Sequence, residues 1–185
     1  MKKTKWLLLG VFLASIAVNA RSANPPAELK TVPHLDLSRY LGRWYEIARY
    51  PNWFEKQCAR DVTATYELRK DGRISVSNAC VKEDGKRRES TGWAKIADPA
   101  SNAKLKVTFF WPFFGDYWVL ELGPNYEYAV IGEPSRKYLW ILSRTPQMSD
   151  EQYRSITGNL SARGYDANRL VRVKQANNLA APSFR

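Results

Sequence analysis

Residues 62–76 read VTATYELRKDGRISV and contain two alternating segments joined by a turn signal. From Val62 to Leu68, apolar residues alternate with polar ones, which is the period-2 pattern of a strand with one apolar face. The Asp-Gly pair at 71–72 is typical of a tight hairpin turn, and the alternation resumes directly after it. This stretch therefore predicts an antiparallel β-hairpin.

Alternating segments of the same kind continue on both sides of this hairpin, with turn signals such as Asp84-Gly85 and Asp98-Pro99 between them. Connections this short leave no room for crossover helices, so the strands must be antiparallel. Eight such strands can remove their open edges by closing into a barrel. The sequence thus predicts an all-β fold, an eight-stranded antiparallel up-and-down β-barrel, with strands near 44–50, 62–68, 74–77, 89–97, 105–111, 117–122, 126–131 and 138–143.

One α-helix is predicted after the barrel strands, and its amphipathic pattern predicts that it packs on the barrel wall. A capping box marks its start and a glycine its end, because these residue types satisfy the terminal backbone groups of helices. The residues concerned are Ser149 and Gln152 at the start, Tyr153, Ile156 and Leu160 on the apolar face, and Gly164 after the end. A last short strand is predicted at 170–173.

The first residues have the composition of a secretory signal peptide. Three lysines precede a mostly apolar run of 13 residues, Trp6 to Val18, which is too short to span a bilayer comfortably. We expect cleavage after Ala20, and no cysteine near that site could carry a lipid anchor. The predicted organisation is a signal peptide (1–20), an N-terminal arm (21–34), a barrel domain (35–175) and a flexible tail (176–185).

The basic net charge by itself does not identify a partner. Lys and Arg number 29 against 18 Asp and Glu, a net charge of +11, and removing the three lysines of the signal peptide leaves +8. Export places the protein away from DNA and RNA, so no nucleic-acid partner is expected. With one His and two Cys, a multi-His or four-thiolate metal centre is excluded, and no metal or cofactor is predicted.

Two segments resemble motifs of a known family. The stretch YLGRWYEIAR, Tyr40–Arg49, resembles the first signature of the lipocalins, especially of their bacterial and apolipoprotein D-like branch. The stretch YLWILSRTP, Tyr138–Pro146, resembles the last barrel strand of that branch, and the resemblance covers about 35–173.

The resemblance implies a structural pair at the closed end of the barrel. There Trp44 is expected to pack against Arg144 in a cation–π contact worth about 0.5–2 kcal/mol. Gly42, Trp44 and Arg144 are accordingly assigned to stability.

The densest aromatic segment is FFWPFFGDYW, residues 109–118. Its periodicity predicts that Phe109 and Trp111 face the barrel interior, while Phe113 and Phe114 fall at a Pro/Gly turn, where loops are normally solvated. The functional interpretation is an apolar lip on the barrel mouth that receives an acyl chain. In the alternative, these rings pack against neighbouring strands or the N-terminal arm. The predicted ligand-binding residues are Tyr66, Val76, Phe109, Trp111, Phe114 and Trp140.

Cys58 and Cys80 are expected to form a disulfide, because an even pair in an exported protein favours one. A tight turn at Asp71-Gly72 would place opposite each other the residues whose numbers sum to 143. The numbers of Cys58 and Cys80 sum to 138, so these two residues are not opposite each other in that register. Cys58 must therefore lie where the chain curves back before the strand, or a bulge must shift the register. The alternative is a reactive Cys58 thiolate.

We therefore expect a periplasmic lipocalin that stores or transports a fatty acid, a lysophospholipid or a similar amphiphile for the cell envelope, without enzymatic activity. The basic loop at 82–88 is a solvated turn or a contact site for an anionic membrane surface. Two alternatives stay open: an enzyme that uses Cys58 on a lipophilic substrate, and a haem or tetrapyrrole carrier that uses His34 as an iron ligand.

Overall fold

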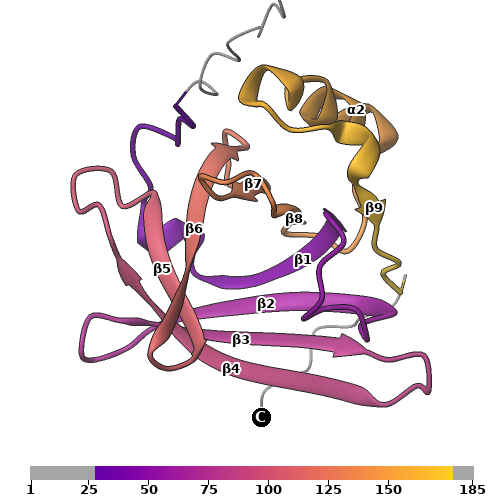
Figure 1. The fold of residues 1–185 in the computed structure, drawn as a ribbon, viewed down its shortest axis with the longest axis horizontal. Coiled ribbons are helices and arrows are strands. Elements are labelled where there is room, and N and C mark those ends of the chain that lie inside the picture. Colours follow the sequence, from indigo (N-terminus) through magenta and orange to yellow (C-terminus); the bar gives the residue numbers. More distant parts are fainter. Residues whose placement is uncertain (1–27, 177–185) are drawn as a thin grey trace, which may run out of the picture.

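The computed structural model describes residues 28–176. Within this range the predicted barrel is confirmed, and the strands follow one another along the chain as neighbours in one antiparallel sheet (Figure 1). Pairing between the first and second strands closes the sheet on itself. The barrel strands are β1 (Gly42–Arg49), β2 (Arg60–Leu68), β3 (Ile74–Val81), β4 (Arg87–Ile96), β5 (Lys104–Phe110), β6 (Phe113–Leu122), β7 (Tyr128–Gly132) and β8 (Leu139–Ser143).

The seam between β1 and β2 is closed by two different parts of the chain. At one end Gly42–Tyr45 pairs directly with Thr63–Tyr66. Towards the other end the two strands diverge, and the segment after β9 (Val171–Arg172) lies between them. The Nε2 of Gln175 donates to the carbonyls of Glu46 and Val62, both at 2.8 Å. The C-terminal segment thus completes the wall where the strands alone would leave a gap.

The two ends of the barrel are built from different parts of the chain, because successive strands run in opposite directions and alternate loops lie at the same end. At the end where β1 starts, the short helix α1 (Leu37–Tyr40) and the buried side chains of Leu35 and Trp44 fill the interior. We call this the closed end. At the other end the loops β1–β2, β3–β4, β5–β6 and β7–β8 surround the interior, and we call it the open end.

A second apolar layer lies between the barrel wall and helix α2 (Asp150–Gly158), which Figure 1 shows beside β7 and β8. Ile156 and Leu160 are fully buried there against wall residues that include Ile141. Within residues 28–176, no helix is both long and apolar enough to cross a membrane.

The helix is shorter than predicted. Ser149 caps it by accepting a hydrogen bond from the backbone N–H of Gln152 at 3.1 Å, but the helix ends at Gly158. Gly164, with φ of +79°, instead follows a 3-10 turn, η1 (Ser161–Arg163), and a second one, η2 (Ala167–Arg169), leads into β9. Glycine tolerates positive φ, so Gly164 does mark the end of a helical element, but that element is η1 and not α2. The predicted signal peptide and most of the predicted tail lie outside the described residues.

Candidate functional site

The barrel encloses a cavity of about 660 Å³ that opens at the open end. This volume lies within the range of about 300–1,000 Å³ that is usual for small-molecule sites. The wall that β2, β3, β5, β7 and β8 contribute is mostly apolar, with Val62, Ala64, Val76, Val107, Ile131 and Leu142. One long, narrow apolar guest would therefore meet hydrocarbon side chains on several sides.

The floor of the cavity is a chain of three tyrosine hydroxyl groups. The Tyr117 hydroxyl lies 2.5 Å from that of Tyr40 and 3.0 Å from that of Tyr66. Burial raises the pKa of all three phenols, so each stays protonated and can donate to its neighbour. Tyr66 and Tyr117 of this floor both line the cavity.

Beneath this floor, the structure places Arg144 on Trp44, as the resemblance implied. The guanidinium carbon lies 3.8 Å from the centroid of the Trp44 ring. The same group donates to the backbone carbonyls of Arg43 at 2.9 Å and Tyr40 at 3.0 Å, and the Trp44 indole N–H also donates to Tyr40 O, at 2.8 Å. Gly42 has φ of +91°, which a side chain would disfavour. These contacts fasten α1 to the barrel at the closed end.

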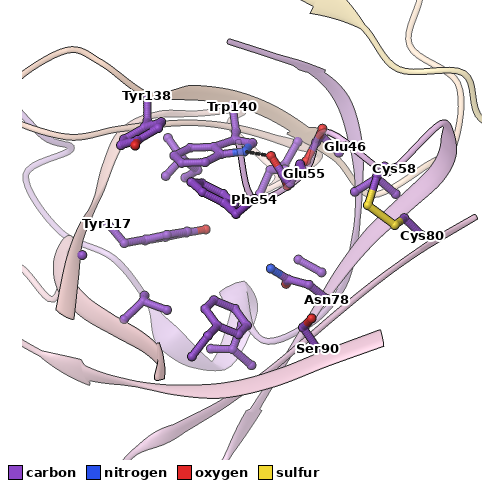
Figure 2. Close-up of a pocket in the computed structure, with 18 of the residues that line it drawn as sticks. Glu46, Phe54, Glu55, Cys58, Asn78, Cys80, Ser90, Tyr117, Tyr138 and Trp140 are labelled. Carbon is purple, nitrogen blue, oxygen red and sulfur yellow. Dashed lines mark hydrogen bonds between the residues drawn. A yellow bond between two sulfur atoms is a disulfide. The ribbon is translucent and has the colours of Figure 1, made fainter. Parts of the chain in front are cut away.

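One side of the cavity carries two carboxyl groups, Glu46 and Glu55, beside a single arginine. Glu46 points inward from β1, is only 4% exposed, and accepts a hydrogen bond from Arg49 Nη1 at 2.6 Å. Glu55 Oε2 lies 3.8 Å from Arg49 Nε and accepts the indole N–H of Trp140 at 3.2 Å (Figure 2). Burial, and next the Glu55 charge, raise the pKa of Glu46 well above its usual range, against the opposing effect of Arg49.

Large aromatic side chains are exposed around the open end. Trp53 is 80% exposed in the β1–β2 loop, and Phe110, Trp111 and Phe113 are 75%, 73% and 71% exposed around the β5–β6 turn. Apolar surface of this size is unusual outside interaction sites. The open end therefore presents an apolar rim, which we define as these four residues.

The structure places five of the six predicted ligand-binding residues on the cavity. Tyr66 and Val76 lie on its inner wall, and Trp140 lies beside Glu55. Phe109 lies near the mouth, where it remains 46% exposed. Phe114 contributes to the lining while its ring contacts Trp93 of β4, with centroids 5.1 Å apart.

The prediction of an inward Trp111 was wrong. The alternation holds through Leu105 and Val107 to Phe109, but β5 ends at Phe110 and a two-residue turn follows. A side chain in a turn has no strand to aim it inward, so Trp111 projects into solvent. Phe113, predicted in the turn, is the first residue of β6 and is exposed as part of the apolar rim.

The predicted disulfide between Cys58 and Cys80 is confirmed, and the described residues contain no unpaired cysteine. The hairpin pairs Tyr66 with Val76, so the paired numbers sum to 142 and the predicted sum of 143 was wrong by one. A bulge between Arg60 and Thr63 shifts the register again, so that Arg60 pairs with Val81. Cys58 lies before β2, where the chain curves back, so both anticipated deviations occur. The bond contradicts the alternative of a reactive Cys58 thiolate.

The iron-ligand alternative finds no support in the position of His34. This side chain is exposed, and the next residue, Leu35, donates its backbone N–H to Ser101 O at the closed end, away from the cavity mouth. Within residues 28–176 there is also no group of three His, Cys, Asp or Glu side chains that could hold a metal ion.

Sequence reasoning missed the residues that give the cavity its polar character. Glu46 follows Trp44 by two positions, so strand alternation alone places a carboxyl group on the inward face. Glu55 lies in an irregular loop, and Tyr117 finds its partner Tyr40 across 77 residues of sequence, so no local pattern indicates either contact.

Comparisons with known proteins agree with this architecture. The family model described as "Lipocalin-like domain" matches residues 35–175. The chain is 46% identical to temperature-induced lipocalin-1 of Arabidopsis thaliana over 157 residues, which cover 80% of this chain and 84% of the relative. It is 40% identical to the outer membrane lipoprotein Blc of Escherichia coli K12 over 170 residues, 91% of this chain and 96% of that protein.

More distant relatives share the same fold. Mouse apolipoprotein D is 31% identical over 183 residues, which cover 92% of each chain. Among solved structures, insecticyanin from the tobacco hornworm Manduca sexta matches with a TM-score of 0.66 and 25% identity, over 81% of this chain and 86% of that chain. The chain is therefore a member of the lipocalin family, in its bacterial and apolipoprotein D-like branch.

Proposed function

We propose that this lipocalin is a binding protein, without enzymatic activity, that carries one fatty acid, lysophospholipid or similar single-chain amphiphile in its barrel. The observation that carries the proposal is the apolar cavity of about 660 Å³ with its hydrogen-bonded floor and aromatic mouth. Burying one CH₂ group contributes about 0.8 kcal/mol, so ten methylenes supply about 8 kcal/mol before entropic costs. Micromolar affinity then requires no further chemistry.

The experiment is a titration of delipidated protein with the fluorescent fatty acid parinaric acid. We expect saturable quenching of tryptophan fluorescence, since Trp140 lies on the cavity. Ala64→Phe adds a ring inside the cavity and should weaken binding at least tenfold. Thr65→Phe, the next residue on β2 and so on the opposite face, adds the same ring outside and should leave binding unchanged. Absence of saturable binding by the wild-type protein would refute the proposal.

We further propose that the carrier works in the periplasm and meets its ligand at an anionic membrane surface, with the open end towards the lipid. The apolar rim lies at the same end as the β3–β4 loop, where residues 82–88 contain four basic and two acidic side chains. Aromatic and basic groups together favour an interface with anionic headgroups. The relatives named as outer membrane lipoproteins are consistent with a place in the envelope.

Co-sedimentation with phosphatidylglycerol and phosphatidylcholine vesicles tests this orientation. We expect binding to the anionic vesicles that falls with added salt and is lost in the Phe110→Ser/Phe113→Ser double variant. Leu68→Ser is the matched control, because Leu68 is an exposed apolar residue at the closed end. Equal loss of binding in the control, or equal binding to both vesicle types, would contradict the proposed contact.

A further inference from the structure

Two hydrogen-bond donors face the cavity from neighbouring strands. Asn78 of β3 lies directly opposite Ser90 of β4 in the strand register, and both side chains line the cavity. Figure 2 shows the Asn78 nitrogen and the Ser90 oxygen directed into the cavity. Residues directly opposite each other on antiparallel strands have Cβ atoms about 4.5–5.5 Å apart, so one small group of a guest can contact both. We call these two residues the donor pair.

Neither donor is engaged by the part of the chain that the structure describes. Among residues 28–176, no side-chain hydrogen bond joins Asn78 or Ser90 to another residue. The Asn78 Oδ1 is buried, so this amide offers only its two N–H groups to the cavity, and the Ser90 hydroxyl can rotate to donate beside them. A donor that a guest shields from solvent is costly unless the guest supplies an acceptor. The donor pair therefore favours a guest with an accepting oxygen at this depth.

The polarity of the cavity wall changes along these two strands. Two positions towards the closed end, Val76 faces Gly92, and Phe109 lies so close to this glycine that a Cβ atom there would be 2.9 Å from the Phe109 Cδ1. Two positions towards the open end, Cys80 faces Arg88, the one basic residue of the lining. Two positions correspond to about 7 Å along a strand. From the closed end outwards, a guest thus meets hydrocarbon, then neutral donors, then a positive charge.

An acyl carbonyl group matches this order of polarity. It is joined to the alkyl chain on one side and to the polar head on the other, and its oxygen has two lone pairs that can accept from two neutral donors. A phosphate, which binds best to charged donors, is better placed beside Arg88. An ammonium group carries only donors, so the donor pair offers it no partner.

The acidic side chains of the neighbouring wall do not prevent this contact. Glu46 and Glu55 share Arg49, whose Nη1 donates to Glu46 at 2.6 Å and whose Nε lies 3.8 Å from Glu55. Burial, and next the Glu55 charge, raise the pKa of Glu46, which favours its neutral form. The three groups together thus carry little net charge, and an uncharged carbonyl oxygen is repelled least by what remains.

We propose that Asn78 and Ser90 bind the acyl carbonyl oxygen of the amphiphile, in a free fatty acid or in an acyl ester, and thereby fix the depth of the chain in the barrel. The inference rests on the proposed function and adds the residues that recognise the head of the chain. Each of the two neutral hydrogen bonds contributes about two- to tenfold in affinity. The alkyl chain then extends past Val76 towards the tyrosines of the floor, and the rest of the polar head lies towards Arg88.

A matched pair of ligands isolates the carbonyl group. Delipidated protein is loaded with the neutral probe N-phenylnaphthylamine, which is displaced by lysophosphatidylcholine with a dodecanoyl ester or a dodecyl ether, each below its micelle-forming concentration. These two ligands differ only in the carbonyl group, and dodecanoate is the free-acid arm. We expect the ester to bind at least about fivefold more tightly than the ether. Failure of every amphiphile to displace the probe would overturn both this inference and the proposed function.

Variants locate the site. Asn78→Leu keeps the side-chain size and Ser90→Ala removes the hydroxyl, and each should lower the affinity for the ester and for dodecanoate about two- to tenfold while the ether binds as before. Asn78→Leu should not lower the urea midpoint of unfolding, because the amide it removes has no partner among residues 28–176. Ser75→Ala, on the outer face of β3, is the matched control and should change none of these affinities.

The pattern of losses decides the outcome. A loss for dodecanoate alone would support the site and assign it to free fatty acids, and a loss for the ester alone would assign it to acyl esters. Variants that weaken all three ligands equally, or none of them, would overturn the inference and leave the proposed function intact, because the donor pair would then not recognise a carbonyl group.

Discussion

Replacing Arg144 with methionine should cost the protein about 3 kcal/mol of unfolding free energy. Methionine keeps much of the packing length and removes the charge. The change abolishes the cation–π contact with Trp44, worth about 0.5–2 kcal/mol. It also deprives the carbonyls of Arg43 and Tyr40 of a charged donor; such hydrogen bonds contribute about 1.5–3 kcal/mol each when well shielded. Arg144 is partly exposed and these contributions are not additive, so their sum is reduced to the expected loss of about 3 kcal/mol.

Urea unfolding followed by tryptophan fluorescence measures this loss, and a thermal scan should show a fall in Tm of about 6–12 °C. The matched control is Arg172→Met. Arg172 also lies over an aromatic ring, Tyr153 at 4.0 Å, but it is half exposed and pairs with the exposed carboxylate of Asp150. Surface contacts of this kind contribute less than about 1 kcal/mol.

Two results would refute the reasoning. One is an Arg144→Met variant no less stable than the Arg172→Met variant, which would mean that the closed end does not depend on the guanidinium. The other is a loss of amphiphile binding by folded Arg144→Met protein. Such a loss would mean that Arg144 acts on the cavity instead of on the closed end.

Three further predictions concern single interactions. The Cys58→Ala/Cys80→Ala variant should lose about 3 kcal/mol, the chain-entropy value for a crosslink over 22 residues, and a denaturant midpoint close to that of wild type would contradict this. Tyr117→Phe should lose about 1–3 kcal/mol in the same assay, because it leaves two buried hydroxyl groups with one partner fewer. The pKa of Glu46 in the folded protein lies above its ordinary value of 4.5, so the folded state binds this proton more tightly than the unfolded state does. The unfolding free energy of the wild-type protein should therefore fall relative to that of Glu46→Gln as the pH rises from below 4.5 to neutrality. A difference that does not change with pH would show that the carboxyl group is not perturbed.

The fold could be predicted because strand alternation and short turns are local signals. The hairpin at 62–76 fixes the direction of two neighbouring strands, and each later turn adds one more neighbour. The limits of the prediction have the same origin. Trp111 continues the alternation in the sequence, but the strand stops one residue earlier, and a period-2 pattern carries no mark of where the sheet ends.

The site was predicted less completely, because its character depends on contacts between distant residues. Val76 and Tyr66 follow from alternation on adjacent strands. The partnership of Glu55 with Trp140 spans 85 residues and joins a loop to β8. The closure of the β1–β2 seam by Gln175 likewise cannot be predicted from local sequence, because no residue near Gln175 indicates that its amide reaches β1 and β2.

The tyrosine floor sets the kinetics of any molecule held above it. With the three hydroxyl groups bonded to one another and Trp44 packed beneath them, a guest enters and leaves through the same opening, and a second guest must wait for the first to depart. Release then requires the whole chain to be withdrawn past the aromatic rim. Each additional methylene, at about 0.8 kcal/mol, would slow that withdrawal by up to about fourfold. If the barrel carries an acyl chain as proposed, its residence time should therefore increase with acyl length.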